Sequence, residues 1–370
     1  MKQKLILFFC LLSICVLAQE HVIEDSTLNT VGNKTKNSFS LRTLPVVYYT
    51  PETQWGFGVA GFFRFKLKHE PDSIRHSNVL FSLTVTTIKQ IVLGAPFQFW
   101  FKKEKYNVYG EPSYQDINLF YYGLGNNNPK KYVEKYYSRF FRLRLAGLYK
   151  VLPHIYAGVR YNMDYTDIYK TEKGGQLHSG IIPGSLGGIA SGLGVTAKFD
   201  NRDNQFYPMK GWYAEFFAVT NSKYLGSTYR FDKYSLDITY NIPIPYLKGT
   251  LAMNAYGVIT TGNTPFYQLG MLGGEKKLRG IYEGKYRDKN CWVLQAEYRR
   301  DLFWRIGFVA FYGIGDVADR FKDFNHRHIR AAWGGGLRGN IDKKQHLNLR
   351  LDVGTCEGII NYYFTIGEAF

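Results

Sequence analysis

The sequence has little cysteine and, after its first residues, no long apolar run. Four Cys in 370 residues are too few for a disulfide scaffold. Beyond the first 18 residues no apolar run reaches the ~18 residues that a membrane-spanning helix needs, so no such helix is predicted. The abundant residues are instead 38 Gly, 30 Tyr and 27 Phe. These residues are poor helix formers, which argues against a helical bundle, and a chain this rich in aromatics is not disordered.

The beginning of the chain differs from the rest. A short basic start precedes an apolar run over residues 5–17, which ends on Ala18. This layout is typical of a cleaved secretory signal, so we predict a signal peptide over residues 1–18. A lipoprotein signal acylated at Cys15 is the alternative, and it is disfavoured because a large residue precedes that cysteine. Residues 19–40 are polar and are predicted to form a flexible N-terminal segment.

Residues 41–370 repeat one pattern. Segments of about ten residues alternate between apolar and polar side chains and are separated by turn residues, as at 193–199, 234–240, 292–298 and 347–353. This alternation predicts antiparallel strands with one apolar face and one polar face.

The two faces of these segments distinguish a membrane barrel from a soluble β-sandwich, which also alternates. The opposite, polar faces carry charges in mid-strand, which a packed core excludes and an aqueous or plugged lumen tolerates. Only a closed barrel satisfies every backbone group in lipid. We therefore predict an all-β fold over residues 41–370, a transmembrane antiparallel β-barrel of the bacterial outer membrane. The apolar faces end in aromatic residues, as a membrane girdle does: Trp212, Tyr240, Trp292, Tyr298 and Tyr362.

The length of the chain and its last residues fit such a barrel. At roughly 20 to 22 residues per strand and connection, about 330 residues give about 16 strands. The last segment alternates through Phe364 and Ile366, and the sequence ends in the same register on Phe370. We interpret these three residues as a C-terminal barrel signal, a terminal aromatic on an amphipathic last strand. A soluble edge strand that ends in Phe is the alternative.

Three segments of the second half carry further motifs. Residues 192–211 read GLGVTAKFDNRDNQFYPMKG and predict a hairpin with Asx-type turn chemistry. Residues 272–290 read LGGEKKLRGIYEGKYRDKN and predict a long, basic, Gly-rich loop, and a loop of this length is more often functional than passive. Residues 291–319 read CWVLQAEYRRDLFWRIGFVAFYGIGDVAD and predict two strands joined by a tight turn near Asp301.

In this order, the three segments resemble the bacterial surface antigen barrel, the family of BamA, TamA and the two-partner secretion transporters. The match covers the second half of the chain, and the first half agrees only in its strand pattern. The resemblance implies a 16-stranded barrel whose long extracellular loop is directed into the lumen. The hairpin residues that match the family are Asp200, Arg202, Asp203, Pro208 and Gly211.

The resemblance also assigns a role to the long loop. It implies that Arg279 pairs with acidic groups on the inner barrel wall, since a guanidinium in a confined lumen needs a carboxylate. Gly280 would let the backbone turn tightly against that wall. The aromatic residue that follows Arg-Gly in the family is here Ile281, with Tyr282 one position later.

The acidic partner is less clear from the motif. The family pattern F-x-D-x-G in the next strand has Gly313 in place of the Asp. Alternation places Glu297 on the inward face, so we expect Glu297 to pair with Arg279. Asp316 is the second candidate, although it lies three residues from Gly313 and hence on the other strand face.

Function is predicted only through this resemblance. It implies a barrel that assists insertion or translocation of protein or lipid at the outer membrane through a weak seam between its first and last strands, or an accessory barrel in such a complex. Assembly members of the family carry periplasmic POTRA domains, and residues 19–40 are too short for one, so we expect a barrel-only member. A passive pore is the alternative, because charged inward faces suit it.

The expected partners follow from the same reading. They are outer-membrane lipid and lipopolysaccharide, together with other outer-membrane assembly proteins. The formal net charge of +17 comes without a nucleic-acid recognition motif, so no nucleic acid is expected, and basic loops suit lipid phosphates. No arrangement of nucleophile and base or of metal ligands stands out. We therefore predict no enzyme activity, no catalytic residue, no cofactor and no metal site.

Overall fold

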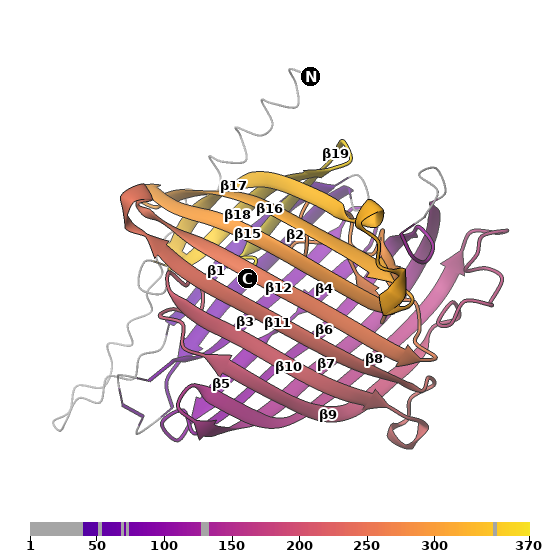
Figure 1. The fold of residues 1–370 in the computed structure, drawn as a ribbon, viewed down its shortest axis with the longest axis horizontal. Coiled ribbons are helices and arrows are strands. Elements are labelled where there is room, and N and C mark those ends of the chain that lie inside the picture. Colours follow the sequence, from indigo (N-terminus) through magenta and orange to yellow (C-terminus); the bar gives the residue numbers. More distant parts are fainter. Residues whose placement is uncertain (1–39, 51–53, 68–69, 72–73, 127–132, 343–345) are drawn as a thin grey trace.

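The described residues form one antiparallel β-sheet of 17 strands, which is curled into a barrel (Figure 1). No helix among them is long and apolar enough to cross a membrane. The predicted signal peptide lies outside the described residues, as does nearly all of the predicted flexible segment. The computed structural model describes residues 40–370 apart from 51–53, 68–69, 72–73, 127–132 and 343–345.

The wall strands follow one another along the chain. They are β1 (Ser40–Thr50), β2 (Gln54–Phe65), β3 (Ser77–Thr86), β4 (Ile91–Gly94), β5 (Phe97–Phe101), β6 (Tyr106–Tyr121), β7 (Glu134–Leu152), β8 (Ile155–Thr171), β9 (Gly188–Asp200), β10 (Gly211–Asn221), β11 (Phe231–Ile244), β12 (Gly249–Gly262), β15 (Asn290–Phe303), β16 (Ile306–Ala318), β17 (Arg330–Asp342), β18 (Leu347–Cys356) and β19 (Ile359–Ile366). Two short strands, β13 (Gly270–Met271) and β14 (Arg287–Asp288), pair with each other in the connection between β12 and β15. Single 3-10 turns occupy Lys223–Leu225, Pro245–Leu247, Phe321–Asp323 and His326–His328.

The strand count agrees with the prediction from length. β4 and β5 both pair with β3 on one side and with β6 on the other, so they are two halves of one broken strand. The break falls at Pro96, which has no N–H to give to a ladder. With that pair counted once, the 17 strands of the described sheet fill 16 positions in the wall. The prediction of an all-β barrel of about 16 strands is confirmed.

Contacts inside the barrel join strands that are far apart in the sheet. Arg42 of β1 donates to the carbonyl of Ile341 at 2.5 Å and pairs with Asp342 of β17 at 3.3 Å, which links the first strand of the wall to the third strand from its other end. The Tyr109 hydroxyl of β6 donates to Glu215 of β10 at 2.5 Å. In Figure 1 the red and orange strands β10 to β16 form the near wall, and the purple strands cross behind them.

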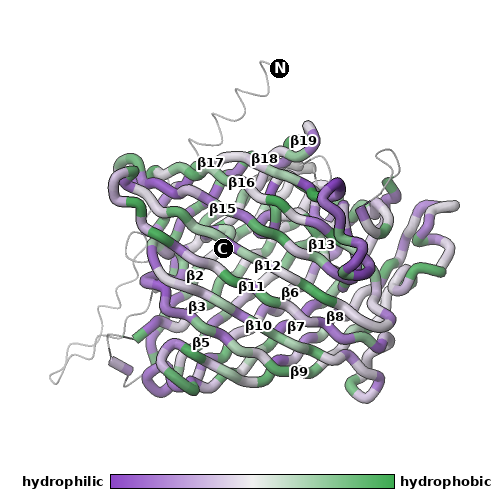
Figure 2. The backbone as a smooth tube through the Cα atoms, viewed as in Figure 1, coloured by the Kyte–Doolittle hydropathy of each residue, from purple (hydrophilic) through white to green (hydrophobic). Residues whose placement is uncertain are grey.

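Alternation sorts side chains between the outer and inner faces of the wall. On β9, Leu193 and Val195 are exposed, whereas Thr196 and Lys198 are buried inside. On β18, Val353 is exposed and its neighbour Asp352 is buried. Figure 2 shows the same alternation of hydrophobic and hydrophilic residues along the strands. An apolar outer face around a polar interior is the arrangement that lipid imposes on a barrel.

Aromatic pairs mark one end of the outer face. Trp212 stacks on Tyr240 with ring centroids 4.0 Å apart, and the Tyr298 ring meets Phe308 at 5.9 Å. These residues lie where the strands meet short connections, and we call this the turn end of the barrel. The opposite end, which carries the long connection between β12 and β15, is the loop end. Of the five aromatic residues predicted as a girdle, Trp212, Tyr240 and Tyr298 thus stand near the rim at the turn end.

The chain leaves the wall after Ile366. Gly367 has a φ of +87° and turns the last residues inward, so that Arg299 of β15 donates to the Phe370 backbone oxygen at 2.8 Å. We call residues 367–370 the tail. Phe370 therefore does not share the strand register of Phe364 and Ile366, contrary to expectation, because a glycine turn and polar partners inside the barrel draw it away from lipid. A role of these residues as a barrel signal stays a prediction.

Candidate functional site

The connection between β12 and β15, residues 263–289, folds into the barrel, and we call it the lumen loop. Four of its apolar side chains are buried in one cluster with inward-facing residues of the wall. Removing these side chains from water favours the docked position. The cluster contains Leu272, Leu278, Ile281 and Tyr286 of the loop and Cys291, Val293, Val317, Ala332 and Cys356 of the wall.

The wall under the loop is lined with glycine. A Cβ added at Gly313 or Gly315 of β16 would come within 2.8 Å or 2.9 Å of a loop leucine. A Cβ added at Gly354 of β18 would lie 2.8 Å from the backbone nitrogen of Gly280. We call Gly313, Gly315 and Gly354 the glycine floor. Any larger residue there would occupy space that the loop now fills.

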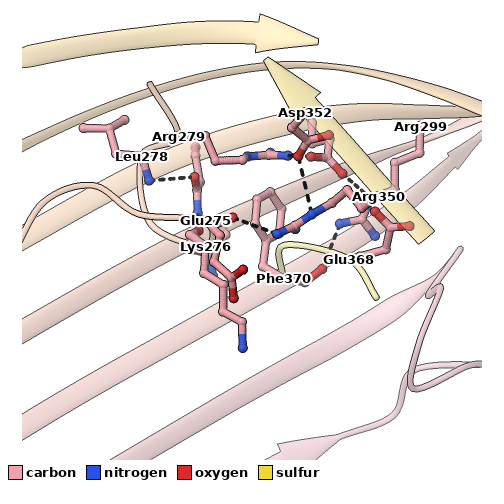
Figure 3. Close-up of polar contacts among 12 residues, drawn as sticks. Glu275, Lys276, Leu278, Arg279, Arg299, Arg350, Asp352, Glu368 and Phe370 are labelled. Carbon is pink, nitrogen blue, oxygen red and sulfur yellow. Dashed lines mark hydrogen bonds and ion pairs between the residues drawn. The ribbon is translucent and has the colours of Figure 1, made fainter. Parts of the chain in front are cut away.

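Arg279 ties the loop to three wall strands. Its guanidinium pairs with Glu297 of β15 and with Asp352 of β18, and its Cζ lies 3.7 Å from the ring centroid of Phe311 on β16. The Arg279 side chain is 1% exposed and both carboxylates are fully buried. Because water cannot solvate these charges, each depends on its partners. Figure 3 shows Arg279 and Asp352 pointing toward one another. The structure thus places Arg279 against Glu297, the partner expected from the sequence.

Gly280 brings the loop backbone against the last two strands. Its φ is +113°, and an added Cβ would lie 2.8 Å from the backbone of Thr355. Its N–H donates to the Tyr363 hydroxyl at 2.9 Å, and its carbonyl accepts from the Asn361 amide at 2.8 Å. Both partners belong to β19, so the docked loop also holds the final strand of the wall.

Tyr282 reaches across the lumen to the opposite wall. Its ring centroid lies 5.8 Å from that of Phe120 and 5.6 Å from that of Tyr122. Its hydroxyl accepts from the Phe120 backbone N–H at 3.3 Å. Its neighbour Ile281 is buried instead against strands β15 to β18, which we call the docking wall. The two residues that follow Arg-Gly therefore face opposite sides of the lumen.

The carboxylates that bind Arg279 also connect it to the tail. Arg299 donates to Glu297 at 2.7 Å, and Arg338 of β17 donates to Asp352 at 2.6 Å. Arg299 also binds the final carbonyl of the tail, and Arg338 pairs at 2.7 Å with the tail's glutamate. One buried ion network therefore includes the lumen loop, the docking wall and the tail, residues 367–370, as Figure 3 shows.

Asp316, the second expected partner of Arg279, is engaged elsewhere. It accepts a hydrogen bond from Asn126, in the connection between β6 and β7, and another from the Val317 backbone N–H at 2.9 Å. Its distance of three residues from Gly313 turns it away from the glycine floor, and Asp352 pairs with Arg279 in its place.

The hairpin motif belongs to the turn end of the barrel. Asp200 pairs with Arg202 at 2.9 Å and with Arg75, from the connection between β2 and β3, at 2.7 Å. Asp203 accepts from two backbone N–H groups of the returning chain at 3.0 and 3.2 Å. Gly211 begins β10 with a φ of +104°. The Asx-type turns that the motif predicts are also present, since the Asp200 carboxylate accepts from the Arg202 backbone N–H at 3.3 Å and the Asn204 side chain accepts from the Phe206 backbone N–H at 2.7 Å.

A cavity of about 290 Å³ separates the hairpin from the lumen loop. Its lining includes Pro208 of the hairpin motif, Lys277 of the lumen loop and Phe370 of the tail. Lys277 pairs with Asp237 of β11 at 2.7 Å. The hairpin, the tail and the tip of the loop thus meet around one space inside the barrel.

A carboxylate at the loop end holds the far part of the lumen loop. Glu357, between β18 and β19, pairs with Lys285 at 3.2 Å, accepts from the Tyr286 hydroxyl at 2.9 Å and pairs with Arg330 of β17. Burial alone would raise the pKa of Glu357, but hydrogen bonds from Tyr286 and Lys285 and the charge of Arg330 lower it below its usual value. The hairpin before the last strand therefore carries a negative charge at neutral pH.

Asp352 is the site residue that the sequence analysis does not single out. The period-2 pattern of residues 347–353 places it on the same face as Arg350, and a carboxylate in mid-strand was the available signal. A Cβ added at Gly336 of β17 would lie 1.9 Å from the Asp352 carboxylate, so this glycine makes room for it. Only the register of β17 and β18 reveals that relation.

Comparisons with known proteins support this architecture. Among solved structures, the chain is similar to BamA from Haemophilus ducreyi lacking POTRA domains 1–3, with a TM-score of 0.55, 14% identity, and coverage of 90% of this chain and 70% of that one. The chain is also similar to CdiB from Escherichia coli, with a TM-score of 0.54 and 11% identity. That match covers 88% of this chain and 61% of CdiB. For CdiB from Acinetobacter baumannii the TM-score is 0.54 and the identity is 12%, and the match covers 89% of this chain and 59% of that one.

These similarities are structural, since the identities are low and the chain spans only about 60% of either CdiB. No curated protein sequence matches the chain. The Omp85 superfamily domain, however, matches residues 32–342, which is most of the barrel. The chain therefore belongs to the Omp85 superfamily, whose members are outer-membrane barrels for protein insertion and translocation.

Proposed function

We propose that this barrel assists the insertion or translocation of protein or lipid at the outer membrane, with the lumen loop as its internal gate. The contact of Arg279 with Glu297 and Asp352 carries this proposal. The loop is held by ion pairs and side-chain packing, so it can leave the lumen without breaking any wall strand. A gate needs such a segment, and a permanently open pore does not.

The last strand of the wall supports a seam that opens toward lipid. β19 has only eight residues, whereas β7 has 19. A short strand offers few ladder hydrogen bonds, so it separates from a neighbour at lower cost than a long one. Because Gly280 binds Tyr363 and Asn361 of β19, loop docking and the position of this strand depend on each other. The partners of this activity would be lipid, lipopolysaccharide and other outer-membrane assembly proteins.

The test is an insertion assay in lipid vesicles that contain the purified barrel. An unfolded eight-stranded outer-membrane protein is diluted from urea, and its folding is followed by its heat-dependent mobility on gels. We expect faster folding than in empty vesicles, and a changed rate with Arg279→Met. Arg144→Met, on the opposite wall, serves as the matched control and should leave the rate unchanged.

Conductance in planar bilayers distinguishes a gated barrel from a passive pore and from an accessory barrel. A docked loop predicts low, flickering current that becomes large and steady when residues 276–289 are deleted. Large, steady current from the intact protein, without faster folding in vesicles, would contradict the gate and indicate a passive pore. If the protein gives no current and does not speed folding, the result would indicate an accessory barrel that acts only within a larger complex.

A further inference from the structure

The connection between β5 and β6 has an unusual backbone. Lys102, Lys103 and Glu104 have φ angles of +49°, +56° and +62°. This left-handed conformation is unfavourable for residues with a Cβ, and a run of three persists only where the surroundings impose it. Two contacts with the neighbouring β2–β3 connection impose it here. Glu70 accepts from the Lys103 backbone N–H at 2.8 Å, and Glu104 accepts from the Arg75 backbone N–H at 2.7 Å.

This conformation separates the charges of the turn. The Glu104 carboxylate is directed to the Arg75 backbone, whereas the side chains of Lys102, Lys103 and Lys105 are exposed. None of these three amines forms an ion pair with any residue that the structure describes. Three neighbouring positive charges without a counter-ion repel one another, so an anion from outside the protein would stabilise the turn.

Two of the amines stand over outward-facing tyrosines. The Lys102 Nζ lies 5.6 Å from the ring centroid of Tyr106, and the Lys105 Nζ lies 5.4 Å from that of Tyr149. The two rings pack edge to face with centroids 5.5 Å apart. Aromatic residues at the ends of barrel strands lie at the level of the lipid headgroups. The amines therefore stand at the height of the lipid phosphates.

We propose that the turn formed by Lys102, Lys103 and Lys105 is a binding site for the phosphate of an anionic phospholipid, in the leaflet at the turn end. The source is a membrane lipid because Lys102 and Lys105 lie over tyrosines of the outer face of the wall. The site uses no residue of the lumen loop or of the tail, so it stands independently of the proposed insertion activity.

The experiment measures lipids retained by the purified barrel. The protein is reconstituted in nanodiscs of phosphatidylethanolamine with a minority of phosphatidylglycerol, and bound lipids are counted by native mass spectrometry. Neutralising the three lysines should weaken phosphatidylglycerol retention about 100-fold, since each surface lysine contributes roughly a factor of five. The matched control removes the same charge from three exposed lysines of the loop end. The turn variant is Lys102→Gln/Lys103→Gln/Lys105→Gln, and the control variant is Lys173→Gln/Lys223→Gln/Lys322→Gln.

Three outcomes would overturn the site. Retention of phosphatidylglycerol by the turn variant as strong as that of the wild type would refute the site. An equal loss of retention in the control variant would show that the effect is not specific to this turn. Displacement of the lipid by millimolar inorganic phosphate would assign the turn to free phosphate instead. Heat-dependent gel mobility verifies that each variant is folded. Tyr106→Leu/Tyr149→Leu keeps all three charges and should lower retention by a smaller factor, because it removes only the ring contacts.

Discussion

The inner wall of the barrel is built in two different ways. Along β6 to β10 the wall fills the lumen with its own side chains, as where Arg144 pairs with Asp164 at 2.9 Å and Arg160 pairs with Glu215 at 2.8 Å. Along β15 to β18 the glycine floor leaves space, and the lumen loop fills it. The first filling cannot leave without unfolding strands. The lumen loop, in contrast, can leave as a unit, so the part of the lumen filling that can move lies on the side of β15 to β18.

The largest effect should come from removing the cation shared by both carboxylates of the docking wall. Arg279→Met leaves Glu297 and Asp352 buried with less compensation, and breaking such a contact costs about 3 kcal/mol or more. We expect a lower thermal transition in detergent and a larger single-channel conductance, because the loop undocks. Arg144→Met on the other wall should lower stability without changing conductance. Equal conductance changes in the two variants would refute the contrast between the walls.

A smaller effect should come from filling the glycine floor. Gly354→Ala forces a methyl group against the Gly280 backbone, at a cost of about 1–3 kcal/mol. The loop should become accessible to trypsin at its lysine pair, Lys276 and Lys277, which limited proteolysis would detect. Gly147→Ala on β7 is the control, since nothing lies within 4 Å of the added Cβ. Protection from trypsin in both variants would mean that the floor does not hold the loop.

The bridge between the two walls should matter less. Tyr282→Leu removes the ring contacts with Phe120 and Tyr122, which are worth about 1 kcal/mol. The loop would stay docked on its own wall, and the current should flicker more without a change in its mean. Tyr224→Leu provides the comparison, because that side chain is 100% exposed. A mean current as high as that of Arg279→Met would place the main anchor on the wrong wall.

The smallest effect should follow acidification. The lowered pKa of Glu357 means that its contribution to stability is present above about pH 4.3, the ordinary value for Glu, and is lost as the pH falls through the folded value. Once Glu357 is protonated, at a pH below its lowered pKa, its contacts with Lys285 and Tyr286 would weaken, and the single-channel conductance should rise slightly. Glu357→Gln should show no such step between pH 5 and pH 3. An unchanged acid step in this variant would assign it to other carboxylates.

Much of the fold could be predicted because lipid makes strict demands on a strand. The outer face must be apolar along its whole length, so alternation in segments such as 193–199 is visible without an alignment. The break between β4 and β5 and the inward turn at Gly367 were not predicted. Each depends on a single residue, Pro96 or Gly367, and on partners that only the folded barrel supplies.

The site was predictable in part, for a related reason. Glu297 shares an inward face with Gln295 and Arg299 on one strand, and this can be read from spacing alone. Asp352 lies on a different strand, and its place beside Arg279 depends on how β16 to β18 are aligned. The same alignment explains why Gly336 is needed, since its missing side chain leaves room for the Asp352 carboxylate. The sequence of a single strand does not reveal how it is aligned with its neighbours, so contacts of this kind could not be predicted.

The unequal lengths of the strands have a consequence for the surrounding bilayer. Eight residues of β19 extend about 26 Å, and a barrel tilt of about 40° leaves roughly 20 Å along the membrane normal. The apolar band of an outer-membrane barrel is about 25 Å tall. The 19 residues of β7 exceed this height, so lipid beside β7 can keep its full thickness. Lipid beside β19 must thin or disorder to avoid hydrophobic mismatch. The protein thereby creates a locally softened patch of membrane along its last strand.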